Sequence, residues 1–212
     1  MRPENLTVFI VDDDPAIRDS LSLMLGLSGY RVAPFSDAES FLAAYQPGWL
    51  GCVVADLRLP GRTGIELQAE LRARNSMLHF IVITAHGDVQ TARTAFQAQA
   101  IDFLEKPFDH AELLAAIETA FTEQERRLDR IRSHDADQHM LETLTGRERE
   151  VLHHVARGLH AKEIARALDI SPRTVEVHKT RIMAKLKARN VAELVRFSLV
   201  TEQGRQGIRD AD

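Results

Sequence analysis

The sequence is short of several residue types and patterns, and each shortage narrows what the protein can be. A single cysteine, Cys52, in 212 residues rules out an internal disulfide and fits a reducing compartment. Aromatic residues make up only 6% of the chain, while aliphatic residues are plentiful. No apolar run is long enough to span a membrane, and the run from Thr7 to Val11 leads into three aspartates rather than a signal peptide. We therefore expect a cytoplasmic protein with no membrane partner, and Cys52 packed in a core.

Length and charge indicate two domains with different partners. A chain of 212 residues exceeds the usual size of one domain, so two compact units are expected. Residues 1–124 contain 9 Lys and Arg against 17 Asp and Glu, whereas residues 140–212 contain 14 against 10. The basic second part is therefore the one expected to meet a polyanion.

The first 124 residues alternate between apolar runs and segments of helical periodicity. Five such βα units predict a parallel sheet covered by helices on both faces, an α/β fold of the flavodoxin-like (βα)5 type. The predicted strands are Val8 to Val11, Val32 to Phe35, Cys52 to Leu57, Phe80 to Thr84 and Ile101 to Leu104. The helices are expected near residues 15–27, 37–46, 63–75, 88–98 and 109–124, with start signals at Asp14-Pro15, Ser36-Asp37 and Asp109.

Residues 125–140 are predicted to link the two domains. The mixed charges of residues 123–130 fit a solvated extension of the last helix, whereas residues 133–139 lack periodicity and are typical of a flexible linker. The spacing of the nearby histidines, His134, His139 and His153, matches no pattern of metal ligands. We expect them to be solvated.

Residues 141–212 predict a small all-α domain of four helices with a frayed tail. Thr145 and Glu148 form a capping box that starts the first helix. The second helix is expected near residues 161–168 and the third from Ser171-Pro172 to about Lys187. Asn190, with Glu193 three residues on, marks the start of the fourth. The polar residues after Glu202 are expected to fray.

Three carboxylates lie at the ends of predicted strands. Asp12 and Asp13 follow the first strand, and Asp56 lies near the end of the third. One Asp at a strand end is more often a loop cap than a reactive group. If the first and third strands are neighbours, however, all three side chains converge at a topological switch point. Like charges so close repel unless a cation lies among them, and a hard divalent ion such as Mg²⁺ suits oxygen ligands. Asp56 could then act as a nucleophile toward a phosphoryl group.

Two further strand ends complete this predicted site. Thr84 offers a hydroxyl group and Lys106 a positive charge, both suited to a dianionic phosphoryl group. The small neighbour Ala85 leaves space beside them. Thr84 alone would be an ordinary strand residue and Lys106 alone a surface charge, so the specificity of the signal lies in the combination.

Four segments carry a resemblance to a known family. They are Val11-Asp12-Asp13-Asp14, Asp56-Leu57-Arg58-Leu59-Pro60-Gly61, Thr84-Ala85-His86-Gly87-Asp88 and Phe103-Leu104-Glu105-Lys106-Pro107-Phe108. With them, residues 7–124 resemble the receiver domain of two-component response regulators, and the whole chain is similar to the NarL/FixJ family.

The resemblance implies a phosphorylation site. By this resemblance, Asp56 would accept a phosphoryl group from a sensor histidine kinase. Mg²⁺ would be held by Asp12, Asp13, Asp56 and the backbone carbonyl of Arg58. Lys106-Pro107 would be a cis peptide. Thr84 would move to form a hydrogen bond with the phosphoryl group while Phe103 turns inward. Residues 88–104 would form the surface at which this change is recognised. Arg58 and His86 would flank the phosphoryl group and tune its hydrolysis.

A second resemblance covers residues 142–200. Segments 144–152, 158–165 and 171–178 resemble the LuxR-type helix-turn-helix. One departure is His160-Ala161, where the family commonly has Ser or Thr followed by Asn. The second helix therefore lacks a good N-cap, a loss of ~1 kcal/mol.

The third helix of this domain has two faces. Val175, Ile182 and Leu186 share one face and are expected to pack inward. The opposite stripe would be a solvated face on charge alone, but the helix-turn-helix context places it in the major groove of DNA. Glu176, Val177 and Thr180 are the expected base readers, with Lys179, Lys185 and Lys187 as phosphate contacts. The full set of predicted DNA-binding residues is Arg173, Thr174, Glu176, Val177, Lys179, Thr180, Arg181 and Lys185, besides Lys187.

The fourth helix has two interpretations. It could pair with its twin in a dimer bound to a pseudo-palindromic site with half-sites ~10 bp apart. Alternatively, Leu194 and Leu199 belong to the core of the monomer.

Together these features predict a transcription regulator rather than an enzyme, with no catalytic residues. Phosphorylation of Asp56 would make it a homodimer on double-stranded promoter DNA, with the histidine kinase as a partner and RNA polymerase as a candidate one. One alternative is a DNA-binding protein controlled by contact, whose receiver is only structural; the intact pocket argues against it. Another is a Mg²⁺-dependent phosphohydrolase, but no general acid motif lies beside Asp56 and the second domain would be unexplained.

Overall fold

The computed structural model describes residues 6–85, 93 and 100–198, and the chain divides into two compact units, Met1–Arg127 and Leu128–Asp212. The first unit contains a five-stranded parallel sheet in the order β2-β1-β3-β4-β5, so the predicted flavodoxin-like α/β fold is confirmed. Its strands are β1 (Thr7–Val11), β2 (Arg31–Phe35), β3 (Gly51–Asp56), β4 (His79–Thr84) and β5 (Asp102–Glu105).

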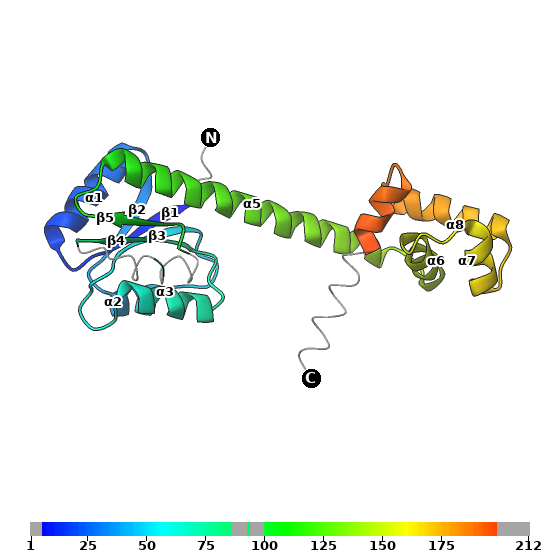
Figure 1. Cartoon of the computed structure of the whole chain (residues 1–212), viewed down its shortest axis with the longest axis horizontal. Helices are drawn as coiled ribbons and strands as arrows, with labels where there is room; N and C mark the ends of the chain where they lie inside the picture. Colours follow the sequence, from blue (N-terminus) through cyan, green and yellow to red (C-terminus); the bar gives the residue numbers. More distant parts are fainter. Residues whose placement is uncertain (1–5, 86–92, 94–99, 199–212) are drawn as a thin grey trace. The chain divides into compact units, whose positions relative to one another are not determined.

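Helices cover both faces of this sheet (Figure 1). On one face, α1 (Pro15–Leu27) and the first part of α5 (His110–Glu142) pack side chains such as Leu25 and Ile117 against Val8 and Ile10 of β1. On the other, α2 (Ala38–Ala44) and α3 (Gly64–Ala73) form a second core with the alternate residues of the strands. Every residue of β3 is buried, as expected for a central strand covered twice. Cys52 packs in the first of these cores.

The residues predicted to start the helices do cap them in the structure. The Asp14 carboxylate accepts from the amide of Ala16, and Pro15 opens α1. Asp37 caps α2 by accepting from the amide of Ser40 at 2.7 Å. Asp109 does the same before α5, accepting from the amide of Ala111 at 3.0 Å. These caps depend on residues a few positions apart, which is why the sequence reveals them. Of the predicted helix over residues 88–98 only Arg93 is described, and it is helical.

The prediction of a flexible linker over residues 133–139 is wrong. Helix α5 continues without a break from His110 to Glu142, so the helical extension expected after residue 124 runs further than foreseen. No Gly or Pro occurs between Pro107 and Gly146, and nothing in the chain therefore stops the helix. The apolar periodicity that would signal a helix is missing because most of this segment is exposed. Asp137 is an exception, being buried and bonded to Arg196 at 3.2 Å.

The second unit is helical. After the end of α5 come α6 (Gly146–Ala156), α7 (Ala161–Leu168) and α8 (Pro172–Lys185), and residues 191–198 are also helical. Their shared core includes Leu141, Val151, Ile164 and Ile182. Leu194 is buried in the same core, which supports its place in the monomer; Leu199 lies outside the described residues, as does the tail expected to fray. None of the described helices is both long and apolar enough to cross a membrane.

Candidate functional site

The polar residues predicted to form a site lie at the same edge of the sheet. Asp12 directly follows β1, Asp56 ends β3, Thr84 ends β4, and Lys106 directly follows β5. Because β1 and β3 are neighbours, their carboxyl ends meet at the switch point of this fold. Asp12, Asp56 and Thr84 are all buried, whereas Ala85 is exposed.

Lys106 joins the two buried carboxylates. Its Nζ lies 2.5 Å from Oδ2 of Asp56 and 2.8 Å from Oδ2 of Asp12. The Lys106 side chain is 16% exposed and that of Asp12 only 1%. An isolated charge buried to this degree would be costly, so the ammonium group is what allows the two carboxylates to lie together.

The other oxygen of each carboxylate is held by the backbone. Asp12 Oδ1 accepts from the amide of Asp14 at 2.9 Å, and Asp56 Oδ1 accepts from the amide of Arg58 at 2.8 Å. Arg18 of α1 also donates from Nη1 to the carbonyl oxygen of Asp12 at 2.7 Å. The two carboxylates are thus fixed in direction before any ligand arrives.

The pKa values at this edge reflect burial and pairing. Burial raises the pKa of Asp12 above its ordinary value, although the hydrogen bond from Lys106 acts against it. Burial alone would lower the pKa of Lys106, but its hydrogen bonds to Asp12 and Asp56 raise it. Lys106 is therefore a firmly protonated cation at neutral pH.

The predicted convergence of three carboxylates is only partly seen. The side chain of Asp13 is exposed, and across residues 6–85, 93 and 100–198 no three His, Cys, Asp or Glu side chains form a group that could hold a metal ion. Asp12 and Asp56 turn toward Lys106, where each forms an ion pair, whereas Asp13 faces solvent.

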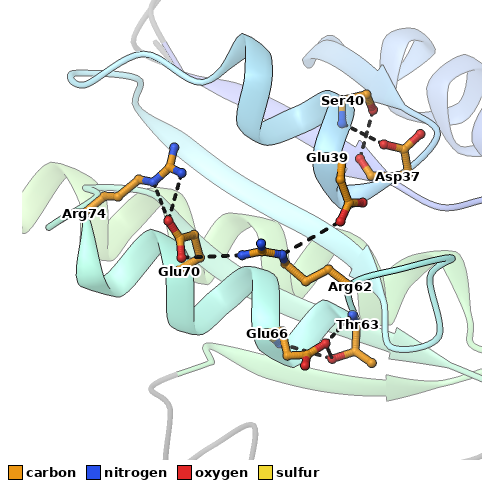
Figure 2. Close-up of polar contacts among 8 residues, drawn as sticks. All are labelled: Asp37, Glu39, Ser40, Arg62, Thr63, Glu66, Glu70 and Arg74. Atoms are coloured by element: carbon orange, nitrogen blue, oxygen red, sulfur yellow. Dashed lines mark hydrogen bonds and ion pairs between the residues drawn. The ribbon is translucent and has the colours of Figure 1, made fainter.

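The loop after Asp56 is tied to the helices on either side of it. Figure 2 shows Arg62 between Glu39 of α2 and Glu70 of α3, at 3.9 Å and 3.5 Å. Thr63 and Glu66 then form a capping box that starts α3. Each exposed ion pair contributes little alone, but together with the cap they hold the loop that carries Arg58.

Gly64 allows α3 to start against the end of β3, which carries Asp56. A Cβ atom at this position would overlap the carbonyl oxygen of Asp56 and lie 3.2 Å from its carbonyl carbon. Gly64 also donates from its amide to the carbonyl oxygen of Leu57 at 3.0 Å. The end of β3 and the start of α3 are therefore in direct backbone contact.

We predict that Gly64→Ala destabilises the first unit and impairs its site, because either α3 or Asp56 must move. The expected cost is about 1 to 3 kcal/mol in the free energy of unfolding. A displaced carboxylate should also react with a small phosphodonor roughly tenfold more slowly or worse. Urea unfolding and the rate of phosphoryl incorporation measure the two effects.

Gly26→Ala is the matched control. Gly26 lies within α1, and a Cβ there meets nothing within 4 Å, so the substitution should stabilise the chain by about 0.5 to 1 kcal/mol. Equal responses of the two variants would contradict the backbone contact described for Gly64.

In the second unit, α7 and α8 form a helix-turn-helix. Ser171 caps α8 by accepting from the amide of Thr174 at 3.0 Å, and Pro172 is its first residue. His160 is the N-cap residue of α7, and its side chain makes no capping hydrogen bond, as predicted. The Glu163 carboxylate instead accepts from the backbone amide of His160 at 2.7 Å, which satisfies one of the unpaired amides at that end.

The two faces of α8 are as predicted from its periodicity. Val175, Ile182 and Leu186 are buried. On the other side Val177 is 43% exposed. Arg173, Glu176, Thr180 and Arg181 are also exposed, while Thr174 and Lys179 are half-buried.

Several of the predicted DNA-binding side chains have partners within the unit. Lys179 lies 3.1 Å from Oε1 of Glu176, and the Thr180 hydroxyl donates to the carbonyl oxygen of Glu176 at 2.9 Å. The partners of Lys185 are distant in the sequence. Its Nζ lies 2.6 Å from Oε2 of Glu148 and donates to the carbonyl oxygen of Thr143 at 3.0 Å.

Glu148 is the centre of this second group. Its Oε2 also accepts from the amide of Thr145 at 2.8 Å, so the predicted capping box is present. Burial by itself raises the pKa of Glu148, but the hydrogen bonds from Lys185 and Thr145 outweigh it and lower the pKa to about 2 from an ordinary 4.5.

This pKa predicts how the stability of the chain depends on pH. A carboxyl group with a lowered folded-state pKa contributes fully above pH 4.5, and its contribution is lost as the pH falls from there toward 2. Glu148→Gln should therefore be less stable than the wild type by about 2 kcal/mol at pH 6, with the gap closing in that acidic window. Urea unfolding of both proteins between pH 2 and pH 6 measures this difference in stability.

Glu150→Gln is the control, because Glu150 forms an exposed pair with Arg147. Its stability should stay within about 0.5 kcal/mol of the wild type at every pH. A stability difference for Glu148→Gln that is the same at every pH would refute the lowered pKa of Glu148.

Comparison with known proteins identifies both units. Residues 8–118 match the model of the response regulator receiver domain, and residues 142–198 match that of the bacterial regulatory proteins of the luxR family. The chain is 43% identical, over 99% of its length and 97% of the other protein, to the transcriptional regulatory protein FixJ of Azorhizobium caulinodans. The chain belongs to the NarL/FixJ family of response regulators. This regulator thus has the receiver and DNA-binding domain types of a two-component protein that controls transcription.

Solved structures agree with this assignment. The response regulator StyR is 41% identical to this regulator, with a TM-score of 0.77 over 92% of this chain and 98% of that one. Full-length FixJ from B. japonicum is 38% identical, with a TM-score of 0.57 over 95% and 99%. The match covers nearly the whole of each protein.

One expectation from the family resemblance, the cis peptide, is met by the structure, whereas the movements expected of Thr84 and Phe103 stay predictions. The Lys106–Pro107 peptide is cis, and Thr84 is buried at the end of β4. Phe103 is half-buried and packs against the core on the α2 and α3 side. His86 and most of the predicted display surface over residues 88–104 lie outside the described residues; residues 100–104 are described.

Sequence reasoning missed the roles of three residues of the regulator, one of which, Glu148, was expected only in a capping box. Arg18 binds the carbonyl oxygen of Asp12, Gly64 contacts the backbone of Asp56, and Glu148 pairs with Lys185. The glycine at the start of a helix directly after a Thr cap was a usable signal for Gly64. Arg18 and Glu148 gave none beyond their local helix positions.

Proposed function

We propose that the regulator is phosphorylated on Asp56 by a sensor histidine kinase and then binds promoter DNA as a dimer. The observation that carries the proposal is the pair of buried carboxylates held by one lysine, with Nζ of Lys106 2.5 Å and 2.8 Å from Asp56 and Asp12. A carboxylate at a buried edge, next to a fixed cation, is what acceptance of a phosphoryl group requires.

The proposed transfer is a simple displacement. A carboxylate oxygen of Asp56 forms a bond to phosphorus while the bond between phosphorus and the donor's histidine nitrogen breaks, and the electron pair of that bond stays with the imidazole. Lys106, already beside Oδ2 of Asp56, neutralises charge on the incoming phosphoryl oxygens. The backbone amide of Arg58 holds the other oxygen of the carboxylate.

The residues at this edge fit Mg²⁺ by their chemistry. Asp12 and Asp56 supply hard oxygen donors, the exposed Asp13 is next to them in the chain, and the carbonyl of Arg58 follows two residues after Asp56. The Lys106 ammonium group marks a point where these carboxylates already share a cation. When bound, Mg²⁺ offsets the negative charge of the phosphoryl oxygens.

Phosphorylation would be sensed by Thr84 and Phe103. Thr84 ends the strand next to Asp56, and its carbonyl oxygen accepts from the amide of Lys106 at 2.7 Å, so a shift of Thr84 toward a phosphoryl group affects the strand that carries Phe103. The ring of Phe103 is half-buried, and we propose that it turns inward. Because Thr84 gains a bond only in the phosphorylated state, the modification favours one of two arrangements, and Ala85 beside it leaves space for the phosphoryl group.

The exposed face of α8 would read DNA. We propose that Glu176, Val177 and Thr180 meet base edges in the major groove, while positively charged neighbours such as Arg173 and Arg181 contact phosphates. Thr174 and Lys179 lie at the edges of this face. The names of the relatives, which are those of transcriptional regulators, support this use of the second unit, and RNA polymerase is a further candidate partner.

The test is to treat the whole chain with acetyl phosphate and Mg²⁺. We expect a mass increase of one phosphoryl group on the peptide that contains Asp56, a shift toward dimers in sedimentation, and tighter binding to DNA selected from a random pool. Omitting Mg²⁺ should prevent all three. Phosphorylation with no change in either sedimentation or DNA affinity would refute the proposed link between the two units, and a modified peptide other than that of Asp56 would refute the site.

A further inference from the structure

We infer that Lys185 is a positioning residue, which holds the recognition helix α8 at its DNA-reading angle, and that it is not a phosphate contact. The inference rests on the proposed DNA-binding function and assigns a role within it. Lys185 is the last residue of α8, and sequence reasoning placed it among the phosphate contacts.

The side chain of Lys185 is directed into its own unit. Its Nζ lies 2.6 Å from Oε2 of Glu148 and 3.0 Å from the carbonyl oxygen of Thr143. The Glu148 side chain is only 4% exposed and that of Lys185 is 35% exposed. If Lys185 moved to a phosphate group, it would leave a buried carboxylate without its cation, which is a strongly unfavourable exchange.

The first turn of α6 binds the last residue of α8 and the last residue of α7. Glu148 binds Lys185 at the end of α8. Its immediate neighbour in the chain, Arg147, donates from Nη2 to the carbonyl oxygen of Leu168, the last residue of α7 before the turn into α8. A lysine at the carboxyl end of a helix also interacts favourably with the helix dipole. The charge on Lys185 is thus used to anchor the helix.

Anchoring matters because base readout depends on angle. A helix of 14 residues rises about 21 Å, so a small rotation about one end moves the side chains at the other by ångströms. Hydrogen bonds to base edges tolerate only about 0.5 Å or 10 to 20°. Phosphate contacts made by flexible lysines tolerate more. Loss of the anchor should therefore reduce specific binding far more than non-specific binding.

Three variants of the whole chain, treated with acetyl phosphate and Mg²⁺, separate the two roles. Lys185→Met removes the anchor, Glu148→Gln weakens it while every positive charge remains, and Lys187→Met removes an exposed lysine two residues on. Gln at the third position of a helix still completes a capping box, so Glu148→Gln preserves the start of α6. Affinity is measured over a range of salt concentrations for selected DNA and for an unrelated duplex.

For a positioning residue, Lys185→Met and Glu148→Gln both lower the ratio of specific to non-specific affinity roughly tenfold or more, with the salt dependence unchanged. Lys187→Met, as a phosphate contact, weakens binding to both duplexes alike and lowers the salt slope by about one. The inference is overturned if Lys185→Met behaves like Lys187→Met, because Lys185 would then be acting on phosphate in the wild type.

Amide hydrogen exchange provides a readout that does not need DNA. In Lys185→Met and Glu148→Gln, the last turn of α8 should exchange faster while the core around Val151 and Ile164 stays protected; unchanged exchange in that turn would refute the anchor. If the wild type binds no selected DNA, the proposed function fails. The exchange data still show whether the contact between Lys185 and Glu148 anchors the end of α8. If Lys185→Met is too unstable to study, Lys185→Arg replaces it. This variant retains the positive charge and should keep the last turn of α8 protected from exchange.

Discussion

Asp56→Asn is expected to remove every response of the regulator to a phosphodonor. An amide is a far weaker nucleophile than a carboxylate, so no phosphoryl group should be incorporated. Coupling between regulatory and binding sites commonly changes affinity 5- to 150-fold, and we expect roughly tenfold or more of phosphodonor-dependent DNA affinity to disappear. Mass spectrometry, sedimentation and DNA binding with and without acetyl phosphate measure the loss.

Asp19→Asn is the matched control, because Asp19 is an exposed carboxylate on α1 and should respond as the wild type does. The Asn variant of Asp56 keeps an acceptor for the Arg58 amide but not the ion pair with Lys106, so it should remain folded with a modest loss of stability. Equal DNA binding by Asp56→Asn and wild type, whether or not the donor is present, would move control of the regulator from phosphorylation to direct contact with a partner.

Lys106→Met is expected to cause the largest loss of stability of any single substitution discussed for the first unit. It leaves the buried carboxylate of Asp12 and its neighbour Asp56 without the cation that lies 2.8 Å and 2.5 Å from them. Removing one partner of a buried ion pair costs about 3 to 5 kcal/mol in the free energy of unfolding. Urea unfolding at neutral pH measures the effect.

Two further measurements assign that loss to the pair of carboxylates. In the double variant Lys106→Met with Asp12→Asn, one of the two buried charges is also gone, and with it the repulsion between them, so a large part of the lost stability should return. Millimolar Mg²⁺ should stabilise Lys106→Met more than it stabilises the wild type, because a bound cation offsets the same repulsion. If the double variant is as unstable as the sum of the two single variants, Lys106 acts through packing instead.

Much of the first unit was predictable because its signals are local. Runs such as Cys52 to Leu57 are apolar on both faces, and only a strand covered twice requires this. The caps at Asp14, Asp37 and Thr145 depend on donors two or three residues away. The parallel order of the strands then places Asp12, Asp56 and Thr84 at one edge without further information.

The same local reasoning failed where an expected signal was absent. Residues 133–139 were predicted to be flexible because they show no apolar periodicity, yet they are helical. An exposed helix needs no apolar stripe, and the lack of Gly and Pro between residues 107 and 146 was the better guide. Periodicity reports which face of a segment is buried, so it is silent on helices that bury little.

The sequence by itself determined the two domains, their order, the secondary structure that starts at recognisable caps, and which strand ends carry carboxylate, hydroxyl and ammonium groups. Only the tertiary structure decided how the charges are shared. It turns Asp12 and Asp56 toward Lys106 and leaves Asp13 exposed, and it binds Lys185 to a glutamate 37 residues away. The physical reason is that an ion pair forms where burial makes an isolated charge costly, and the burial of each charge depends on segments that are distant in the chain.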